Sequence, residues 1–375
     1  MLHGQSPWLK LGVALCQKSK PVGRGYNRRV NTIDGQLPPA LLRGIDQLVQ
    51  GVPIGRLRRA SARLTDAYRR DAGRVSAMAS TADRLAYIGA RLPATFHATR
   101  SVLKNFSRCG LDSRVTSFLE LGAGPAPGLW AAYEQFPSLL KATHVEQDHE
   151  MAELGRQLLR STVIAQRIQS AWNGQPVPVS SDFGKHDVTL LAYLVGELDD
   201  DVRCQVLTSA WNSTRVALVV IEPGTPAGAR RVLQARTWLV SQGGHVAAPC
   251  PHSVACPLPD EDWCHFSVRL NRSSLHRQLK GGTLAYEDEK YSYVVITRNA
   301  VARCQSRVLR HPQFTPRRVT LQLCSGDGLR TQQVTRGEGA DYRRARKVRW
   351  GDAWETPAKP NEDGNRELKE NVRDL

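Results

Sequence analysis

Three cysteines lie within fifteen residues in the stretch CPHSVACPLPDEDWC, residues 250–264. Five residues separate Cys250 from Cys256, seven separate Cys256 from Cys264, and proline follows the first two cysteines. Thiolates are soft ligands that suit zinc or an iron–sulfur cluster. Zinc sites usually contain cysteine pairs about two to four residues apart, which this stretch lacks, whereas cysteine followed by proline also occurs in ferredoxin loops. The stretch therefore favours an iron–sulfur cluster. Zinc, or three buried thiols without a metal, are the alternatives.

The clustered cysteines need a further ligand from elsewhere in the chain. His252 and His265 are candidates next to the cysteines, and Cys304 and Cys324 are candidates farther along the chain. Cys324 ends an expected strand at a glycine-containing turn, which is a rigid and partly exposed position. We therefore favour Cys324 and leave the other three open.

A second pattern that could bind a ligand is the glycine-rich turn ELGAGPAPG, residues 120–128. Gly122, Gly124 and Gly128 follow an expected buried strand and precede an expected helix. In this setting the backbone can approach a nucleotide-like cofactor, and the N–H groups of the helix point at it. Glu120 precedes the turn, and Glu146 ends the next expected strand, where a carboxylate can accept hydrogen bonds from ribose hydroxyls. A turn without a ligand is the other interpretation.

This Glu-x-Gly-x-Gly arrangement resembles the class I methyltransferases, which bind S-adenosylmethionine. The cofactor-binding residues implied are Glu120, Gly122, Gly124, Gly128 and Glu146. Asp148 is a second candidate for the ribose, and Asp187 and Tyr193 are candidates to line the site. The Asn- or Asp-Pro-Pro-aromatic segment of amino-methylating enzymes is replaced by LAYLVGEL, and no nucleophile or general base stands out. The catalytic residues are therefore unknown, because cofactor binding alone does not establish catalysis.

Positive charge is concentrated in two flanks of a chain whose formal net charge is +17. Residues 18–70 and residues 303–350 each carry twelve Lys or Arg against three acidic residues. Such an excess suits a polyphosphate partner, and arginine with tryptophan or tyrosine suits unpaired RNA bases. Tyr342, Trp350 and Trp354 interleave with arginines in DYRRARKVRWGDAW. The predicted RNA-binding residues are Arg317, Arg318, Arg343, Arg344, Arg346, Lys347 and Arg349.

The elements that would position these residues can be read from hydrophobic periodicity. Apolar residues recur every three or four positions in the first hundred or so residues, which predicts amphipathic helices. From residue 115, buried strands alternate with helices, for example VTSFLEL, KATHV, HDVTLLA and RVALVVI, and predict a parallel sheet with helices on both faces. A strand YSYVVITR and a basic hairpin with its turn at Ser325 to Gly328 follow the cysteine stretch.

Composition limits the class of protein. A chain of 375 residues with 41% hydrophobic residues can bury a large core, and its apolar runs are far shorter than a membrane span. We therefore expect a soluble, intracellular protein without membrane contact. Eight cysteines without an export signal favour metal binding over disulfides. Cys16, Cys109 and Cys204 stand alone and are expected to be buried thiols.

Several segments together resemble one family, the methyltransferase-like assembly factors of the small ribosomal subunit in mitochondria and bacteria. They are CPHSVACPLPDEDWCHFSVRL, ELGAGPAPGLWAA, EDEKYSYVVITR, RVLRHP, LCSGDGL and YRRARKVRWGD. The resemblance covers roughly residues 37–354. It implies an S-adenosylmethionine-type fold with a four-iron, four-sulfur cluster, bound to the RNA of the small subunit during assembly. Cys250, Cys256, Cys264 and Cys324 match the cluster ligands, and Cys304 has no counterpart.

The fold class expected is α/β, a class I methyltransferase-like (Rossmann-like) domain with a helical N-terminal region and a small β-rich C-terminal region. The regions expected are a basic leader (1–35), a helical domain (36–110), the methyltransferase-like domain (111–245), the iron–sulfur and RNA-binding region that completes the sheet (246–350) and a polar tail (351–375).

The expected function is assistance in assembly of the small ribosomal subunit and in translation, with an active rRNA methyltransferase as the alternative. We expect a monomer away from the ribosome. The absence of a clear Arg- and Ser-rich leader favours a bacterial cytoplasm, and the mitochondrial matrix is the location expected for a eukaryotic protein.

Overall fold

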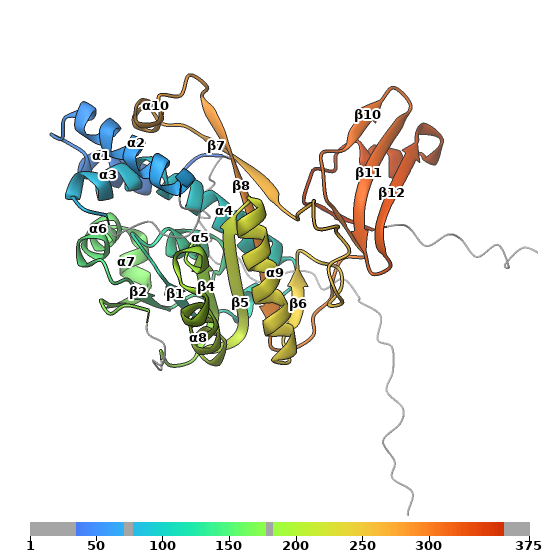
Figure 1. The fold of residues 1–375 in the computed structure, drawn as a ribbon, viewed down its shortest axis with the longest axis horizontal. Coiled ribbons are helices and arrows are strands. Elements are labelled where there is room, and N and C mark those ends of the chain that lie inside the picture. The colour runs from blue at the N-terminus through green and yellow to red at the C-terminus, as the bar shows by residue number, and fades with distance from the viewer. Residues whose placement is uncertain (1–34, 71–77, 178–182, 356–375) are drawn as a thin grey trace, which may run out of the picture. The chain divides into compact units, whose positions relative to one another are not determined.

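The computed structural model describes residues 35–70, 78–177 and 183–355 of the chain (Figure 1). The α-helices are α1 (Pro39–Leu48), α2 (Ile54–Arg70), α3 (Thr81–Ala90), α4 (Leu92–Ser107), α5 (Pro127–Gln135), α6 (His149–Leu159), α7 (Val163–Arg167), α8 (Asp200–Asn212), α9 (Pro226–Ser241), α10 (Ser274–Lys280) and α11 (Ala340–Ala345). The strands are β1 (Ser117–Leu121), β2 (Lys141–Val145), β3 (Gln169–Asn173), β4 (His186–Ala192), β5 (Thr214–Pro223), β6 (His245–Ala248), β7 (Phe266–Asn271), β8 (Tyr286–Thr297), β9 (Ser306–Val308), β10 (Gln313–Thr315), β11 (Arg318–Ser325), β12 (Gly328–Thr335) and β13 (Ala353–Trp354).

The larger sheet has the strand order β3-β2-β1-β4-β5-β8-β6, and β7 also pairs with β8. Strands β1 to β5 are parallel, whereas β8 is antiparallel to β5. A parallel sheet whose order reverses at β1, with one antiparallel strand inserted near an edge, is the class I S-adenosylmethionine-dependent methyltransferase fold. The predicted fold class is therefore confirmed. Strands β1 to β5 form the predicted parallel part of the sheet, and the chain after β5 adds the antiparallel strand β8 with its partners β6 and β7.

Hydrophobic layers cover both faces of this sheet. Successive residues of a strand point to opposite faces, so Val219 of β5 packs in the layer that includes α4 and α5, and Val220 packs in the layer that includes α8 and α9. This arrangement explains the unbroken apolar run of β5, because a strand covered on both faces needs no polar side. The apolar stripe of α4, which includes Phe96, Leu103 and Phe106, is fully buried in the first layer.

Strand β8 organises the cysteine stretch. One edge of β8 pairs with β5, and the other edge pairs with β7 over Tyr286 to Tyr291 and with β6 over Val295 to Thr297. Strands β6 and β7 thus follow each other along one edge of β8. The chain leaves this edge after Ala248 and returns to it at Phe266. The cysteine stretch is therefore a loop anchored at both ends by the same strand.

The smaller sheet has the order β10-β11-β9-β13, with β12 paired to β11. Its hairpin matches the predicted one, since Ser325 pairs with Gly328 across the turn. Trp354 of β13 is 1% exposed and joins the core of this sheet. Residues 351–355 therefore belong to this sheet, beyond the boundary predicted at 350. The remaining residues of the predicted leader and tail, 1–34 and 356–375, lie outside the described part of the chain.

Some elements carried too little signal to be predicted. Strand β3 (QSAWN) is a polar edge strand, and β6, β9, β10 and β13 contain two to four residues each. Such strands are defined by their partners and not by their own sequence pattern. In the described residues, no helix is sufficiently long and apolar to span a bilayer.

A buried carboxylate holds the turn between β1 and α5. Glu120, which is 3% exposed, accepts a hydrogen bond from the Gly128 N–H (2.8 Å) and lies 3.2 Å from His144 Nδ1. A Cβ atom at Gly128 would lie 2.3 Å from Glu120 Oε1 and 2.5 Å from Leu190 Cδ2. The close approach of helix and strand therefore requires glycine at this position.

Replacement of Gly128 by alanine should lower the free energy of unfolding by about 1–3 kcal/mol, because the methyl group must displace the Glu120 carboxylate. Chemical denaturation measures this change. Gly326→Ala is the matched control, because a Cβ atom there meets nothing within 4 Å. Equal stability of the two variants would contradict the assigned role of Gly128.

Candidate functional site

The largest cavity that we describe lies at the carboxyl ends of β1, β2 and β4 and has a volume of about 870 Å³. This is the edge of an α/β sheet, at the reversal of strand order, where ligands bind in doubly wound folds. Of the five predicted cofactor residues, Gly122, Gly124 and Glu146 line the cavity. Glu120 and Gly128 do not line it, and they contact each other behind the turn. Asp148 and Tyr193 also line the cavity.

The glycine turn exposes its backbone to this cavity. Gly122 and Gly124 have φ angles of +64° and +52°, a region that favours glycine. A Cβ atom at Gly124 would meet nothing within 4 Å, so the backbone is open to a ligand there. At Gly122 the Cβ would lie 2.8 Å from Leu194 Cδ1, so this glycine is needed for packing.

Glu146 lies between the turn and the end of β2. Its carboxylate accepts hydrogen bonds from the backbone N–H groups of Gly124 (2.7 Å) and Asp148 (2.8 Å). Burial raises the pKa of Glu146, and these two bonds act in the opposite direction. Asp148 is held by Arg84, whose Nε lies 2.8 Å from the carboxylate. Two carboxylates are thus fixed at the mouth of the turn.

The end of β4 places an aromatic side chain in an unusual backbone conformation. Tyr193 has a φ angle of +59°, and its hydroxyl donates a hydrogen bond of 3.0 Å to Glu289. Non-glycine residues in this region are uncommon and are often associated with function. Asp187 does not reach the cavity, because it accepts hydrogen bonds from Thr116 and Ser117 at the start of β1. Asp187 thus joins two strands at the opposite end of the sheet.

The cysteine loop forms a second candidate site. Cys250, Cys256 and Cys264 line a cavity of about 230 Å³ together with Arg236. Burial raises the pKa of Cys264 well above its usual range, and Cys250, Cys256 and Cys324 raise it further because thiolates repel one another. The four predicted ligands therefore share one neighbourhood. Within the described ranges, however, no three His, Cys, Asp or Glu side chains are arranged so that they could hold a metal ion.

Cys324 reaches this neighbourhood from the smaller sheet. Its side chain is buried, and its Sγ lies 3.4 Å from His252 Nε2. Burial, followed by the charges of Cys250 and Cys256, raises the pKa of Cys324 to about 12. Cys304 also lies near Cys324 and contributes to that shift. Proximity to Cys324 therefore leaves Cys304 close to the site as well, and the preference for Cys324 continues to depend on its position at the hairpin turn and on the resemblance.

Two buried arginines hold the cysteine loop. Arg236 of α9 donates hydrogen bonds to the carbonyl oxygens of His252 (3.1 Å) and Val254 (2.7 Å). Arg307 of β9 donates to Pro249 O (2.8 Å), and both guanidinium groups lie beside Cys250. Sequence analysis missed both arginines, because nothing in a helix or a short strand signals contact with a distant loop.

All seven predicted RNA-binding residues are exposed, and the list is Arg317, Arg318, Arg343, Arg344, Arg346, Lys347 and Arg349. The aromatic residues between them differ from expectation. Trp354 is buried, with the Arg344 guanidinium 4.3 Å from its ring centre. Trp354 therefore packs within the protein and is not available to stack on a base. Cys204 is also exposed, contrary to the expectation of a buried thiol, and Cys16 lies outside the described residues.

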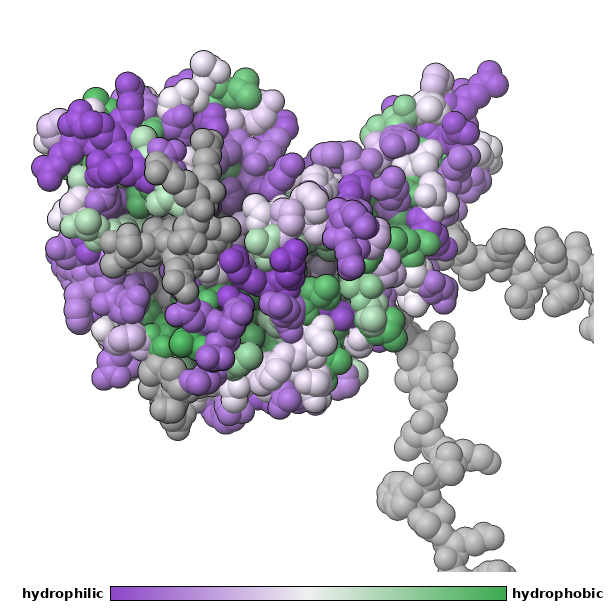
Figure 2. Space-filling model, viewed as in Figure 1, coloured by the Kyte–Doolittle hydropathy of each residue, from purple (hydrophilic) through white to green (hydrophobic). Residues whose placement is uncertain are grey.

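The first basic flank extends along α2, where Arg56, Arg58, Arg59 and Arg63 are exposed. Figure 2 shows hydrophilic side chains grouped over the helical end that carries α2. The residues of this flank before 35 are outside the described part of the chain.

Comparison with known proteins supplies the family. The family described as "Mitochondrial small ribosomal subunit Rsm22" matches residues 81–355. The chain belongs to the Rsm22 family. The matched residues include both the glycine turn and the cysteine loop.

Two curated relatives of this Rsm22 chain carry mitochondrial names. Human "Ribosome assembly protein METTL17, mitochondrial" is 29% identical over 291 residues, which cover 72% of this chain and 61% of the relative. "Rsm22-cox11 tandem protein 2, mitochondrial" of Schizosaccharomyces pombe is 26% identical over 325 residues, which cover 72% of this chain and 42% of the relative. The chain thus spans less than two thirds of either relative. An O-methyltransferase family protein from Burkholderia thailandensis is a structural neighbour with 12% identity and a TM-score of 0.41, covering 70% of this chain and 72% of that protein.

Two carboxyl groups near the cofactor cavity were not predicted from the sequence. Glu197 lines the cavity and Glu222 lies at the end of β5, and burial raises the pKa of each to about 7. Both have an ordinary value of 4.5, so the folded protein holds these protons more tightly than the unfolded chain does. Their position follows from the tertiary structure, which no local motif records.

Stability should therefore depend on pH. The raised pKa values stabilise the folded protein fully below about pH 4.5, and this stabilisation is lost as the pH rises through about 7. The free energy of unfolding should therefore decrease over this window. Glu222→Gln should flatten the decrease, as measured by denaturation from about pH 5 to about pH 8. Asp201→Asn, at an exposed position, is the control. An unchanged slope for Glu222→Gln would contradict the assignment.

Proposed function

We propose that the chain binds S-adenosylmethionine, carries a four-iron, four-sulfur cluster and assists assembly of the small ribosomal subunit by binding its RNA. The observation that carries this proposal is the approach of four cysteines from two distant segments, one of which belongs to the basic small sheet. Cys264 lies in the loop after β6, and Cys324 lies in β11, which begins with the exposed Arg318. A cluster there would connect the methyltransferase-like sheet to the RNA-binding surface.

The cavity at the glycine turn suits S-adenosylmethionine. Glu146 would accept hydrogen bonds from the ribose hydroxyls, and the open backbone at Gly124 would allow the cofactor to approach closely. Apolar side chains on the other wall, including Met151, Val177 and Leu198, suit the adenine ring. When bound, S-adenosylmethionine supplies an activated methyl group on a sulfonium centre.

Glu146→Ala should weaken binding of S-adenosylmethionine about tenfold or more, because the ribose loses a charged hydrogen-bond partner. Isothermal titration calorimetry of the purified protein measures the affinity. Glu153→Ala is the control, because Glu153 lies on the neighbouring helix α6, its side chain is 46% exposed and it does not line the cavity. Equal affinity of Glu146→Ala and wild type would exclude Glu146 as the ribose ligand.

We favour an iron–sulfur cluster over a single zinc ion at the cysteine site. The four thiols share a neighbourhood, and their spacing along the chain lacks the close cysteine pairs that zinc sites usually contain. The Nε of Arg236 has no hydrogen-bond partner in the described residues. Arg236 and Arg307 would balance the negative charge of a cluster with its thiolates.

Cys264→Ser and Cys324→Ser should each abolish the visible absorbance of anaerobically purified protein and its bound iron and sulfide. Cys204→Ser and Cys304→Ser are the controls and should retain the cluster. Iron and zinc assays distinguish the two metals. If Cys324→Ser retained the cluster and Cys304→Ser lost it, Cys304 would be the fourth ligand and not Cys324.

The ribosomal part of the proposal is supported by charge and family. The seven exposed cations predicted to bind RNA lie in or beside the small sheet, and the human relative is named as a ribosome assembly protein. If the cluster stabilises this surface, Cys264→Ser should also weaken binding to small subunits. For a eukaryotic chain the proposed location is the mitochondrial matrix, as the names of the relatives suggest, and for a bacterial chain it is the cytoplasm.

An active rRNA methyltransferase is the alternative function. The residue that favours it is Tyr193, which lines the cavity at the end of β4 in a left-handed conformation. Maps of methylated nucleotides in small-subunit RNA, from cells with and without the protein, separate the two functions. The enzyme predicts a mark that disappears with the protein, whereas the assembly factor predicts unchanged marks and fewer mature subunits.

A further inference from the structure

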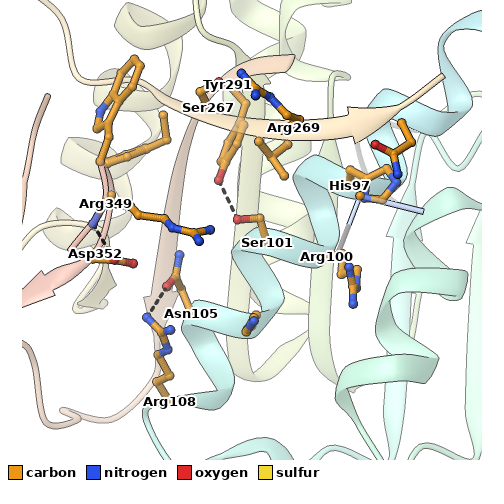
Figure 3. A pocket seen from close by; sticks show the side chains of 17 residues that line it. His97, Arg100, Ser101, Asn105, Arg108, Ser267, Arg269, Tyr291, Arg349 and Asp352 are labelled. Atoms are coloured by element: carbon orange, nitrogen blue, oxygen red, sulfur yellow. Dashed lines mark hydrogen bonds between the residues drawn. The ribbon is translucent and has the colours of Figure 1, made fainter. Parts of the chain in front are cut away.

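A third cavity, of about 420 Å³, lies between α4, β7 and the segment Arg349 to Asp352 (Figure 3). It is separate from the S-adenosylmethionine cavity and shares no lining residue with it. Five cationic side chains line it, and they are Arg100, Lys104, Arg108, Arg269 and Arg349. Asp352 is the one carboxylate that lines it among the described residues.

Two of these cations are already neutralised. Arg269 forms a two-pronged ion pair with Asp288 at 2.7 and 2.8 Å, and Arg100 lies 2.6 Å from Glu134. Lys104 and Arg349 have no acidic partner for their side chains in the described part of the chain, and Arg108 contacts only the neutral Asn105, at 3.4 Å. The unpaired positive charge therefore lies between the end of α4 and the C-terminal segment.

The geometry places these cations on two facing walls. Lys104 and Arg108 are four residues apart, so they lie on the same side of α4 and its C-terminal turn. Figure 3 shows the Arg349 side chain extending toward α4, in the direction of Ser101 and Asn105. A bound anion could thus be contacted from both sides at once.

The other walls provide aromatic surface. Phe266, Tyr291 and Trp350 line the cavity; Phe266 and Tyr291 are 3% and 2% exposed, so the partly exposed Trp350 is the ring of the three that a ligand could stack on. Trp350 is held by edge contacts with His265 (4.8 Å) and His311 (5.0 Å).

We infer that this cavity binds one nucleotide of a single-stranded RNA segment, with its phosphate held between Lys104, Arg108 and Arg349. A nucleotide combines the required anion with an aromatic base and several oxygen acceptors, and the volume lies within the range of small-ligand sites. An acidic peptide would supply carboxylates, but it has no flat ring for the aromatic wall. This inference rests on the proposed RNA binding and assigns that binding to a specific site. Of the seven residues predicted to bind RNA, only Arg349 lines this site.

The cavity is also connected to the cysteine loop. Phe266 follows Cys264 by two residues, and Ser292 Oγ donates a hydrogen bond of 2.8 Å to Cys264 O. Trp263 stacks on His265 at 5.3 Å, and His265 in turn contacts Trp350. A change in the cysteine loop would therefore reach the wall of the nucleotide cavity.

The test compares the full chain with the double variant Lys104→Ala/Arg349→Ala in binding a fluorescent single-stranded RNA. Affinity should fall about tenfold at physiological salt, and the slope of log affinity against log salt should decrease in magnitude by about 0.7, for the one phosphate that these cations neutralise. The charge-preserving variant Lys104→Arg/Arg349→Lys should bind nearly as wild type does. Arg160→Ala/Arg167→Ala removes two exposed cations remote from the cavity and should change affinity less than about threefold.

The outcomes separate the site from the general function. If wild type binds RNA and the double alanine variant binds equally well, the cavity is not the site and the proposed function stands. If wild type binds no RNA, the proposed function fails as well. Displacement of the RNA by polyglutamate or by low concentrations of uridine monophosphate would overturn the assignment in favour of an acidic peptide or a free nucleotide. If thermal melting shows that the double variant is unfolded, the single variant Lys104→Glu, at an exposed position, replaces it in the RNA-binding comparison with wild type.

Discussion

The buried guanidinium of Arg307 is the interaction on which both halves of the C-terminal region depend. It extends from β9 of the small sheet and donates hydrogen bonds to Pro249 O, at the start of the cysteine loop, and to Gly351 O, 3.0 Å away, in the segment that follows the basic helix α11. It is 6% exposed and lies beside Cys250 and Cys264. One side chain thus fixes the loop that would hold a cluster and the segment that closes the cationic cavity. Loss of this group would leave the carbonyl oxygens of Pro249 and Gly351 without this donor and would remove one positive charge from beside Cys250 and Cys264.

The two glutamates of the glycine turn illustrate a division of roles within one motif. Glu120 precedes the turn and Glu146 follows the next strand, β2, yet both accept hydrogen bonds from backbone N–H groups at the turn. Glu120 is enclosed by Gly128 and His144, so its carboxylate fixes the angle between strand and helix. Glu146 faces the cavity and is the one of the pair that a ligand can reach. A motif of this kind therefore contains one residue that shapes the site and one that is available for binding.

Much of the fold could be predicted because its signals are local. The strand, glycine turn and helix around Gly122, and the hairpin at Ser325, follow from alternation and turn residues within a few positions of each other. The strand end and glycine turn at Cys324, together with the family resemblance, made it the favoured further ligand candidate, and Cys250, Cys256 and Cys324 all act on the pKa of Cys264. By contrast, the polar edge strand β3, the acids Glu197 and Glu222 and the facing cations Lys104 and Arg349 are brought into position by segments distant in sequence. Spacing along a chain contains no information about such encounters.

The insertion of β8 between β5 and β6 has a consequence for the order in which the protein can be completed during synthesis. Strand β6 leaves the translating ribosome first, but its partner in the sheet is β8, which is made later. Until β8 emerges, β6 has no edge to join, and the loop that follows it has neither of its two anchors. The cysteine loop is therefore shaped late, after its own residues have been synthesised, and Cys324 arrives later still. A metal centre that uses all four cysteines could therefore assemble only after most of the C-terminal third has been synthesised.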